Sequence, residues 1–323
     1  MNIKLNNTTL KSKVILAPMA GVTDLPFRKI VREFGDFLMF SEMVASQAVI
    51  RNVKRTYKMI EGAEDELTSV QIVGADPRVM AEAAKLSYDL GAKFIDINMG
   101  CPVKKIVRSE SGSALMKNEK LAAKIIESVV NAVSIPVTLK MRLGWDMEHK
   151  NSPVLAKIAE DLGIQMITVH GRTRSQLYSG IANWKDIRLV KEAVKIPVIA
   201  NGDIISVESA RQALIDSQAD GIMIGRGAFG QPWLLRQIHN DITGDEEPFD
   251  ITPQKKYELS KRHIGYMLEF YPEDTAVKMS RKVLMYYCRG GQNASKYRQL
   301  INTVDTVQAV YDLLNSFFEA NEC

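Results

Sequence analysis

Short runs of Val, Ile, Leu and Met alternate with longer amphipathic stretches over the first 230 residues. The short runs lack a helical period and end in polar or glycine-containing turns, which is typical of buried β-strands. The longer stretches place apolar residues at i, i+3 and i+4, which predicts helices over ranges that include 77–90, 118–133 and 206–218. The predicted strands begin near Val14, Phe37, Leu67, Phe94, Val137, Met166, Val198 and Gly221.

Strict alternation of strands and helices predicts an α/β fold with a parallel sheet, because parallel strands need a helical crossover. Eight such units fit a (β/α)8 TIM barrel. An open, doubly wound sheet is the competing topology. The barrel is favoured because eight units match its typical size and no Gly-x-Gly-x-x-Gly motif follows the first strand.

The repeat ends after a last barrel helix predicted at 232–240. Residues 243–250 are acidic, contain Gly and Pro and have no periodicity, which indicates a domain boundary. We therefore predict a catalytic barrel domain over residues 1–243 and a small helical bundle over residues 244–323. The bundle helices are predicted at 252–271, 273–289, 293–303 and 304–320.

Composition is that of a globular protein, with 46% hydrophobic and 25% charged residues. Apolar runs are strand-sized, and the first ten residues lack the apolar core of a secretory signal, so we expect a cytoplasmic protein. The three cysteines fit neither a disulfide framework nor a Cys-x-x-Cys metal site. The four histidines are not at ligand spacing, so no metal is expected.

Positive charge is concentrated in the predicted bundle, although the net charge of the chain is only +4. Between Lys255 and Arg298 there are ten Lys and Arg against four Asp and Glu, with tyrosines interleaved. Basic side chains neutralise phosphates and aromatic rings stack on bases, so this region could face RNA. A solvated face over an ordinary core is the alternative that composition leaves open.

A polar loop follows the predicted strand 94–98 and contains Cys101, which the next residue, a proline, stiffens. A lone cysteine is often a small buried hydrophobe. Here its place at the carboxyl end of a strand favours a functional site, because that end of a barrel carries the chemistry. Asn98 and the cations Lys104, Lys105 and Arg108 could hold an anionic substrate beside a proton donor.

Polar side chains recur at the ends of the other predicted strands, and in a barrel these ends meet at one rim. Loops after strands seven and eight commonly bind phosphate, so residues 201–203 and 225–227 predict a phosphorylated cofactor. Lys140 could stabilise negative charge on a reduced flavin, and Gln71 could pair with the ring edge. The rim residues are Glu42, Gln71, Asn98, Cys101, Lys140, Arg142, His170, Arg172, Arg174, Asn201, Asp203 and Arg226.

Together these motifs resemble the tRNA-dihydrouridine synthases, and most of all their bacterial B type. The resemblance implies an FMN-containing barrel, a helical tRNA-binding domain, and reduction of the C5–C6 bond of a D-loop uridine. NADPH or NADH would bind transiently as the reductant. The motifs are APMAGVTDLPFR (17–28), SEM (41–43), VQIVG (70–74), DINMGCPVKK (96–105), GSALM (112–116), LKMRLGW (139–145), VHGRTR (169–174), NGDI (201–204) and IGRG (224–227).

The resemblance also implies residue roles. Reduced flavin would give hydride to C6 of the uracil, and Cys101 would give a proton to C5, since a thiol of pKa ~8.5 is mostly protonated at neutral pH. FMN would be bound by Pro18, Met19, Ala20, Gln71, Lys140, His170, Asn201, Gly202, Asp203, Gly225 and Arg226. The substrate would be bound by Asn98, Lys104, Lys105, Arg108, Arg174, Lys255, Lys256, Arg281 and Lys282.

One departure and two alternatives accompany this interpretation. The family's basic run usually continues after the loop arginine, whereas Ser109 and Glu110 follow Arg108 here, which weakens the expected phosphate contact. A dihydroorotate-dehydrogenase-like enzyme would share the barrel residues but act on a free pyrimidine, which needs no basic bundle. A non-catalytic RNA-binding protein would lack flavin absorption.

Overall fold

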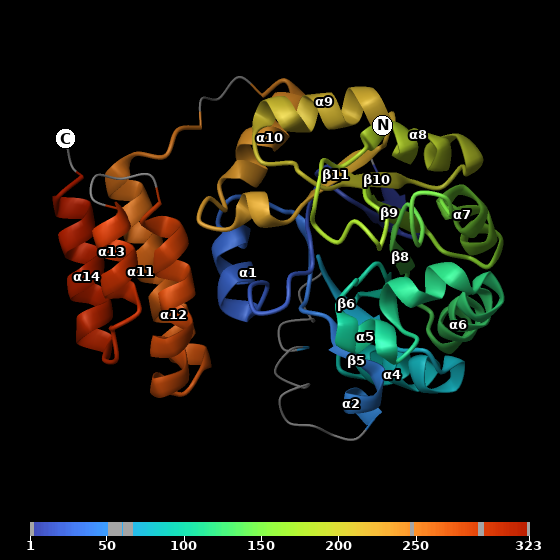
Figure 1. Ribbon diagram of the computed structural model, residues 1–323, viewed down its shortest axis with the longest axis horizontal. Coiled ribbons are helices and arrows are strands. Elements are labelled where there is room, and N and C mark those ends of the chain that lie inside the picture. Colours follow the sequence, from blue (N-terminus) through green and yellow to red (C-terminus); the bar gives the residue numbers. More distant parts are fainter. Residues whose placement is uncertain (1–2, 51–59, 61–66, 246–248, 290–293, 322–323) are drawn as a thin grey trace.

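The computed structural model describes residues 3–50, 60, 67–245, 249–289 and 294–321 (Figure 1). In this part of the chain, eight parallel strands close into a barrel, because β11 pairs back with β3 and β4 pairs with β6. The predicted barrel and its eight strands are confirmed, and the open sheet is wrong. The strands are β3 (Val14–Leu16), β4 (Leu38–Phe40), β6 (Thr68–Val73), β7 (Phe94–Met99), β8 (Val137–Arg142), β9 (Met166–His170), β10 (Val198–Asn201) and β11 (Gly221–Ile224).

Helices cover the outside of the barrel and bury their apolar faces against the outer faces of the strands. Their ends follow local rules: Asp76 caps α4 by accepting from the N–H groups of Arg78 and Val79, and Gly91 after α4 has a φ of 97°. The helices are α1 (Leu25–Arg32), α2 (Ser46–Ile50), α4 (Pro77–Asp89), α6 (Glu119–Ala132), α7 (Ser152–Asp161), α8 (Trp184–Ala193), α9 (Val207–Ser217) and α10 (Leu234–Thr243).

Two features lie outside the predicted repeat. A hairpin of β1 (Lys4–Leu5) and β2 (Thr8–Thr9) packs its apolar side chains against the inward-facing residues of the barrel strands. Because its apolar residues pack against inward-facing residues such as Phe94 near the amino ends of the strands, the hairpin closes the amino end of the barrel. A two-residue strand, β5 (Val44–Ala45), pairs in parallel with β6.

The barrel interior changes from apolar to polar along the strands. Alternate residues of a strand point the same way, so Phe94, Asp96 and Asn98 of β7 face inward. Phe94, near the amino end, packs in the inner apolar cluster with Ile15 and Met166. The polar side chains follow toward the carboxyl end, where they can meet a ligand.

Four helices follow the barrel and share a second apolar core that includes Ile264, Leu284 and Leu314. They match the four helices predicted from the sequence; the division between residues 243 and 244 stays a prediction. None of the described helices is long and apolar enough to cross a membrane. The helices are α11 (Pro253–Phe270), α12 (Glu273–Tyr287), α13 (Ala294–Ile301) and α14 (Val307–Glu319).

The C-terminal helices pack beside α1 (Figure 1). Tyr271 donates a hydrogen bond of 2.9 Å to Asp24, the residue that caps α1. Lys282 Nζ lies 3.2 Å from the carbonyl of Gly21, in the loop that follows β3. The helices therefore contact the rim at the carboxyl end of the barrel, where the candidate site lies.

Candidate functional site

The loop after β7 holds Cys101 by hydrogen bonds on both sides of the residue. Asn98 Oδ1 accepts from the backbone N–H groups of Gly100 at 3.1 Å and Cys101 at 2.9 Å. The carbonyl of Cys101 accepts from the N–H of Ser113 at 3.0 Å and from its hydroxyl at 2.8 Å. The thiol-bearing residue is thus fixed between the end of a strand and the 3-10 helix η1 (Gly112–Lys117).

A buried polar relay lies beneath this loop and joins three strands. Asn98 Nδ2 donates to Gln71 Oε1 at 2.8 Å, and Gln71 Nε2 donates to Asp96 Oδ2 at 2.6 Å. Thr138 Oγ1 donates to the other oxygen of Asp96 at 2.6 Å. The Gln71 amide therefore orients Asn98, and one of its N–H groups and one oxygen lone pair remain for a ligand.

Asp96 is a site residue that the sequence analysis missed. Burial raises the pKa of its carboxyl to about 7, although the hydrogen bonds from Gln71 and Thr138 and the charge of Lys140 act in the opposite direction. The available signal was its position: in the strand 94–98 it lies two residues before Asn98 and so shares its inward face.

The Cys101 thiol is half-buried, and burial is the largest influence on its pKa, which it raises. A hydrogen bond from the backbone of Val103 and the charges of Arg142 and Lys140 lower the pKa by less. A thiol with a raised pKa stays protonated at neutral pH. It is therefore suited to give a proton rather than to act as a nucleophile.

Lys140 lies on β8, and its Nζ donates a hydrogen bond of 3.1 Å to Oδ1 of Asn201 at the end of β10. Asn201 is oriented in turn, because its Nδ2 donates to the carbonyl of Met223 at 2.8 Å. Burial, followed by the charge of Arg142, lowers the pKa of Lys140 to about 8, so the side chain is still mostly cationic at pH 7. The structure thus brings Lys140 and Asn201 together, as expected for one cofactor site.

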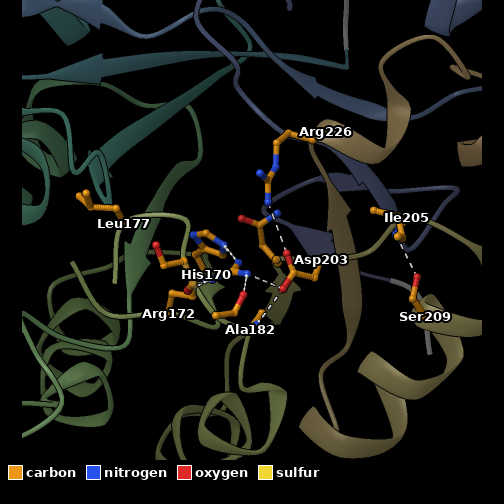
Figure 2. A network of polar contacts seen from close by, with 12 residues as sticks. His170, Arg172, Leu177, Ala182, Asp203, Ile205, Ser209 and Arg226 are labelled. Atoms are coloured by element: carbon orange, nitrogen blue, oxygen red, sulfur yellow. Dashed lines mark hydrogen bonds and ion pairs between the residues drawn. The ribbon is translucent and has the colours of Figure 1, made fainter. Parts of the chain in front are cut away.

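His170 lies at the end of β9 and is neutral. Burial lowers its pKa well below the usual value, and the charges of Lys140, Arg142, Arg172 and Arg226 lower it further. Arg172 Nη1 lies 3.3 Å from His170 Nε2 (Figure 2). Because a guanidinium only donates, Nε2 is the acceptor and Nδ1 carries the proton. Four cations that face one neutral ring make this end of the barrel electropositive.

Asp203 joins two of these cations (Figure 2). Its carboxylate accepts from Arg172 Nη2 at 2.6 Å and from the backbone N–H of Ala182 at 2.8 Å, and Arg226 Nη2 lies 3.4 Å away. Two guanidinium groups exceed one carboxylate, so the group keeps net positive charge. Gly202 has a φ of +115°, and a Cβ there would lie 2.6 Å from the His170 ring, so packing requires a glycine.

The loop after β3 forms the next part of the rim. Glu42 Oε1 accepts from the N–H of Gly21 at 2.5 Å, and Thr23 Oγ1 accepts from the N–H of Met19 at 2.9 Å. Pro18 and Met19 are half-buried and Ala20 is exposed. A Cβ on Gly225 would meet Met19 Sδ at 3.7 Å, so this loop adjoins the residues predicted to bind phosphate.

The predicted loop cations occupy a short helix rather than an irregular loop. Lys104, Lys105 and Arg108 lie on α5 (Lys104–Arg108), and all three are exposed. No carboxylate partner contacts them within the described part of the chain. They therefore remain available to an anionic ligand.

Arg174 is held against an aromatic ring. Its Cζ lies 4.5 Å from the centroid of the Trp145 ring, and Lys117 Nζ lies 4.6 Å from the same centroid. Arg174 Nε is buried without a hydrogen-bond partner among the described residues. Arg174 was predicted as a site residue from the sequence, whereas Trp145, in the loop after β8, and Lys117, the last residue of η1, were not.

The predicted cations of the C-terminal helices differ in their surroundings. Arg281 donates twice to the carbonyl of Val304, at 2.7 and 3.0 Å, so its guanidinium links α12 to the chain before α14. Lys256 is half-buried, and burial lowers its pKa. Lys255 is exposed, and Lys282 reaches the barrel rim. Lys255 and Lys282 are thus the more accessible of the four.

The described residues contain no group of three His, Cys, Asp or Glu side chains that could hold a metal ion. The polar groups that converge at the rim are amides, one thiol and several cations. Such a set suits an anionic organic ligand better than a metal, since metal sites need carboxylate, imidazole or thiolate ligands.

Comparison with known proteins places these residues in context. The dihydrouridine synthase (Dus) family profile matches residues 15–322. The chain is 50% identical over 319 residues to a probable tRNA-dihydrouridine synthase of Rickettsia bellii, with 98% of each protein covered. It is 42% identical over 318 residues to tRNA-dihydrouridine synthase B of Pseudomonas aeruginosa, which covers 98% of this chain and 96% of that protein.

Solved structures show a similar fold at low sequence identity. Histamine dehydrogenase from Rhizobium sp. 4-9 matches 82% of this chain with a TM-score of 0.56 and 14% identity. A 2-naphthoyl-CoA reductase matches 75% of it with a TM-score of 0.59 and 12% identity. The matched regions span 50% and 52% of those longer chains. Because the identities are only 14% and 12%, these two likenesses show the fold alone.

Proposed function

Because this chain belongs to the dihydrouridine synthase family, we propose that it reduces the C5–C6 double bond of a D-loop uridine in tRNA to 5,6-dihydrouridine. The proposed bound cofactor is FMN, and NADPH or NADH is the transient reductant. The proposed substrate, tRNA, places the reaction in the cytoplasm.

The observation that carries this proposal is the position of Cys101 relative to Lys140. Asn98, which accepts from the Cys101 N–H, lies opposite Lys140 in the β7–β8 pairing, and Arg142 Nε donates to the carbonyl of Gly100 at 2.8 Å. Burial raises the pKa of the thiol. A protonated thiol and a fixed cation thus share one rim. Reduction of a uracil ring needs both, because negative charge develops on the ring before C5 takes its proton.

The rim residues fit FMN in charge and in shape. At the phosphate end, Arg226 would pair with the phosphate, and the backbone of Gly202, Asp203 and Gly225 would approach it. Asp203 is already neutralised by Arg172, so it does not exclude an anion. At the ring end, the residues that would hold the flavin are Pro18, Met19, Ala20, Gln71, Lys140, His170 and Asn201. When bound, FMN supplies the hydride.

The protein residues perform the remaining steps. Cys101 Sγ–H gives its proton to C5 of the uracil, and the charges of Arg142 and Lys140 stabilise the thiolate that remains. Water then returns a proton to the sulfur. Asn98 holds the backbone of Cys101 in place throughout, since its Oδ1 accepts from that N–H. The target base must leave its stack to reach this site.

The proposed RNA contacts lie on both parts of the chain. The α5 cations Lys104, Lys105 and Arg108, together with Arg174, would bind phosphates near the flipped nucleotide. Lys255, Lys256 and Lys282 would bind the body of the tRNA. Arg281 would contribute charge at longer range, because its guanidinium already donates to Val304.

The test combines cofactor identification with an assay on unmodified tRNA. The purified protein should show flavin absorption and release FMN, and it should form dihydrouridine with NADPH or NADH. Cys101→Ala should retain FMN and tRNA binding but form little dihydrouridine. Cys288→Ala, which removes a buried cysteine of the C-terminal helices, is the matched control and should retain activity. Wild-type product levels from Cys101→Ala would contradict the mechanism.

Two further outcomes test the proposed substrate. A flavoprotein that reduces or oxidises a free pyrimidine but leaves tRNA unmodified would support the dihydroorotate-dehydrogenase-like alternative. A protein that binds tRNA without any flavin would be a non-catalytic RNA-binding protein. The accessible cations around the rim favour tRNA, because a free pyrimidine needs no extended basic surface.

A further inference from the structure

The loop between β9 and α8 is held rigidly over the barrel mouth by two buried arginines. Arg142 Nη1 donates to the carbonyls of Thr173 and Leu177, each at 2.8 Å. Arg172 donates to the carbonyls of Ser179 at 3.1 Å and of the next residue, a glycine, at 2.7 Å. Both arginine residues are 2% exposed. Charge-assisted hydrogen bonds from buried donors fix the backbone on both sides of residue 178.

Leu177 at the apex of this loop has a φ of +51°. A residue with a Cβ is strained in this left-handed region. Its side chain does not offset that strain by burial, because Leu177 is 44% exposed. Strained backbone held by surrounding contacts is concentrated at ligand-binding sites.

The residue presented by this apex is Tyr178, which is 55% exposed. Its ring centroid lies 5.6 Å from Arg142 Cζ and 5.4 Å from Arg226 Cζ. Arg142 comes from β8 and Arg226 follows β11, so the ring lies above the ends of the two strands between them. Its hydroxyl has no hydrogen-bond partner among the described residues.

We propose that Tyr178 is a stacking platform for a tRNA base next to the uridine that is reduced. This inference rests on the proposed function. An exposed aromatic ring on a rigid loop can stack on any base, since every base has a π-face. The guanidinium groups of Arg142 and Arg226 lie beside the ring and fix its orientation.

The position of Tyr178 separates this role from cofactor binding. Lys140 and His170, the proposed flavin contacts, are the inward-facing ends of strands, whereas Tyr178 lies eight residues beyond the end of β9 and is exposed. A ring at the entrance of the barrel would contact the substrate RNA, which binds after the cofactor, rather than the cofactor itself. The proposal therefore predicts an effect on tRNA affinity and none on FMN affinity.

The test measures tRNA binding and FMN binding separately. Tyr178→Leu keeps apolar bulk but removes the π-face, and it should weaken binding of unmodified tRNA roughly tenfold. Tyr178→Phe keeps the stacking surface and should bind tRNA as the wild type does. FMN affinity, measured by the change in flavin fluorescence on titration, should be the same in all three proteins. Ile181→Ala, a change at an 80% exposed residue of the same loop, is the matched control.

Unchanged tRNA affinity in Tyr178→Leu would overturn the proposal, as would a loss of FMN affinity in that variant, which would make Tyr178 a cofactor contact. A Tyr178→Phe variant as weak as Tyr178→Leu would also overturn it, since the hydroxyl would then carry the effect. Direct binding keeps this test separate from the proposed reaction: a wild-type protein that binds tRNA but forms no dihydrouridine contradicts the reaction alone.

Discussion

Gln71 Nε2 lies 2.6 Å from Asp96 Oδ2, inside the barrel and beneath the loop that carries Cys101. The same glutamine accepts from Asn98, which in turn fixes the backbone N–H of Cys101. The orientation of the proposed proton donor thus depends on a carboxyl group three hydrogen bonds away. That carboxyl also raises the pKa of Lys140, so it connects the two groups on which the proposed chemistry depends.

Asp96→Asn should shift the alkaline limb of the pH profile of tRNA reduction to lower pH. Asparagine can accept from Gln71 Nε2 through its oxygen and donate from its amide nitrogen to the Thr138 hydroxyl, but it lacks the negative charge that raises the pKa of Lys140. That pKa, now about 8, should fall, and the cation should be lost nearer neutral pH. The measurement is kcat/KM for tRNA between pH 6 and 9, with FMN retention monitored.

The control for this change is Asp220→Asn. Asp220 pairs with Lys191 at the amino end of the barrel, so its carboxylate is remote from Lys140. This variant should keep the wild-type alkaline limb. If Asp96→Asn also keeps it, the charge of Asp96 does not act on Lys140 and the relay is only structural.

Alkylation of Cys101 by iodoacetamide should be slow at pH 7. Only the thiolate reacts, and burial raises the pKa of this thiol, so the thiolate fraction at neutral pH is smaller than in a free cysteine. The alkylation rate of a free cysteine stops increasing once the thiol is fully ionised. The rate for Cys101 should still increase with pH at that point. Peptide mass mapping reads each cysteine separately. Cys288, whose pKa is raised by burial to about 12, should react more slowly still. Rapid labelling of Cys101 at pH 7 would show an activated thiolate and oppose its role as an acid.

Removing Lys117 and Arg174 together should weaken tRNA binding and reduce its dependence on salt. Both cations contact the Trp145 ring, and neither has a carboxylate partner in the described parts of the chain. Each phosphate contact that is lost should lower the slope of log K against log salt by about 0.7–0.9. The measurement is the tRNA dissociation constant of Lys117→Ala/Arg174→Ala from low to high salt. Lys124→Ala, an exposed lysine on α6, is the control, and an unchanged slope in the double variant would remove this pair from the RNA surface.

Most of the barrel could be predicted because its signals are local. Each strand is a short apolar run and each long helix has its own period, so the pattern identified all eight strands. The hairpin of β1 and β2 and the short helix α5 were missed, because two-residue strands and five-residue helices are too short to show a period. The sequence of α5, KKIVR, is equally compatible with a loop.

The candidate site could be predicted only in part, since its contacts join residues far apart in the sequence. The rule that strand ends carry polar residues gave Cys101 and Lys140. It could not show that Asp96 bonds to a side chain 25 residues earlier, or that Arg281 donates to a carbonyl 23 residues later. The sequence shows which residues are charged, but it does not show which groups those residues bond to in the folded protein.

The contact between Tyr271 and Asp24 joins the C-terminal helices to the barrel rim, and it should make stability depend on pH. Burial raises the pKa of Asp24 to about 6, so the folded protein holds this proton more tightly than the unfolded chain does. Above about pH 6, the buried carboxylate is charged and lowers the free energy of unfolding. As the pH falls from about 6 toward 4, the carboxylate takes up a proton in the folded protein and this destabilisation is lost.

Asp24→Asn should remove that dependence. Asparagine keeps an oxygen that caps α1 by accepting from Phe27, but it carries no charge to bury. The thermal midpoint at pH 8 should rise relative to the wild type, and the difference should shrink at pH 4. Tyr271→Phe should lower the thermal midpoint at pH 8, because the charged carboxylate loses the hydrogen bond from the tyrosine hydroxyl. A hydrogen bond to a charged group contributes about 1.5–3 kcal/mol. The measurement is the thermal unfolding midpoint of the three proteins at pH 4 and pH 8. A lower midpoint for Asp24→Asn at pH 8 would contradict the prediction, because it would mean that the charged carboxylate stabilises the contact between the C-terminal helices and the barrel.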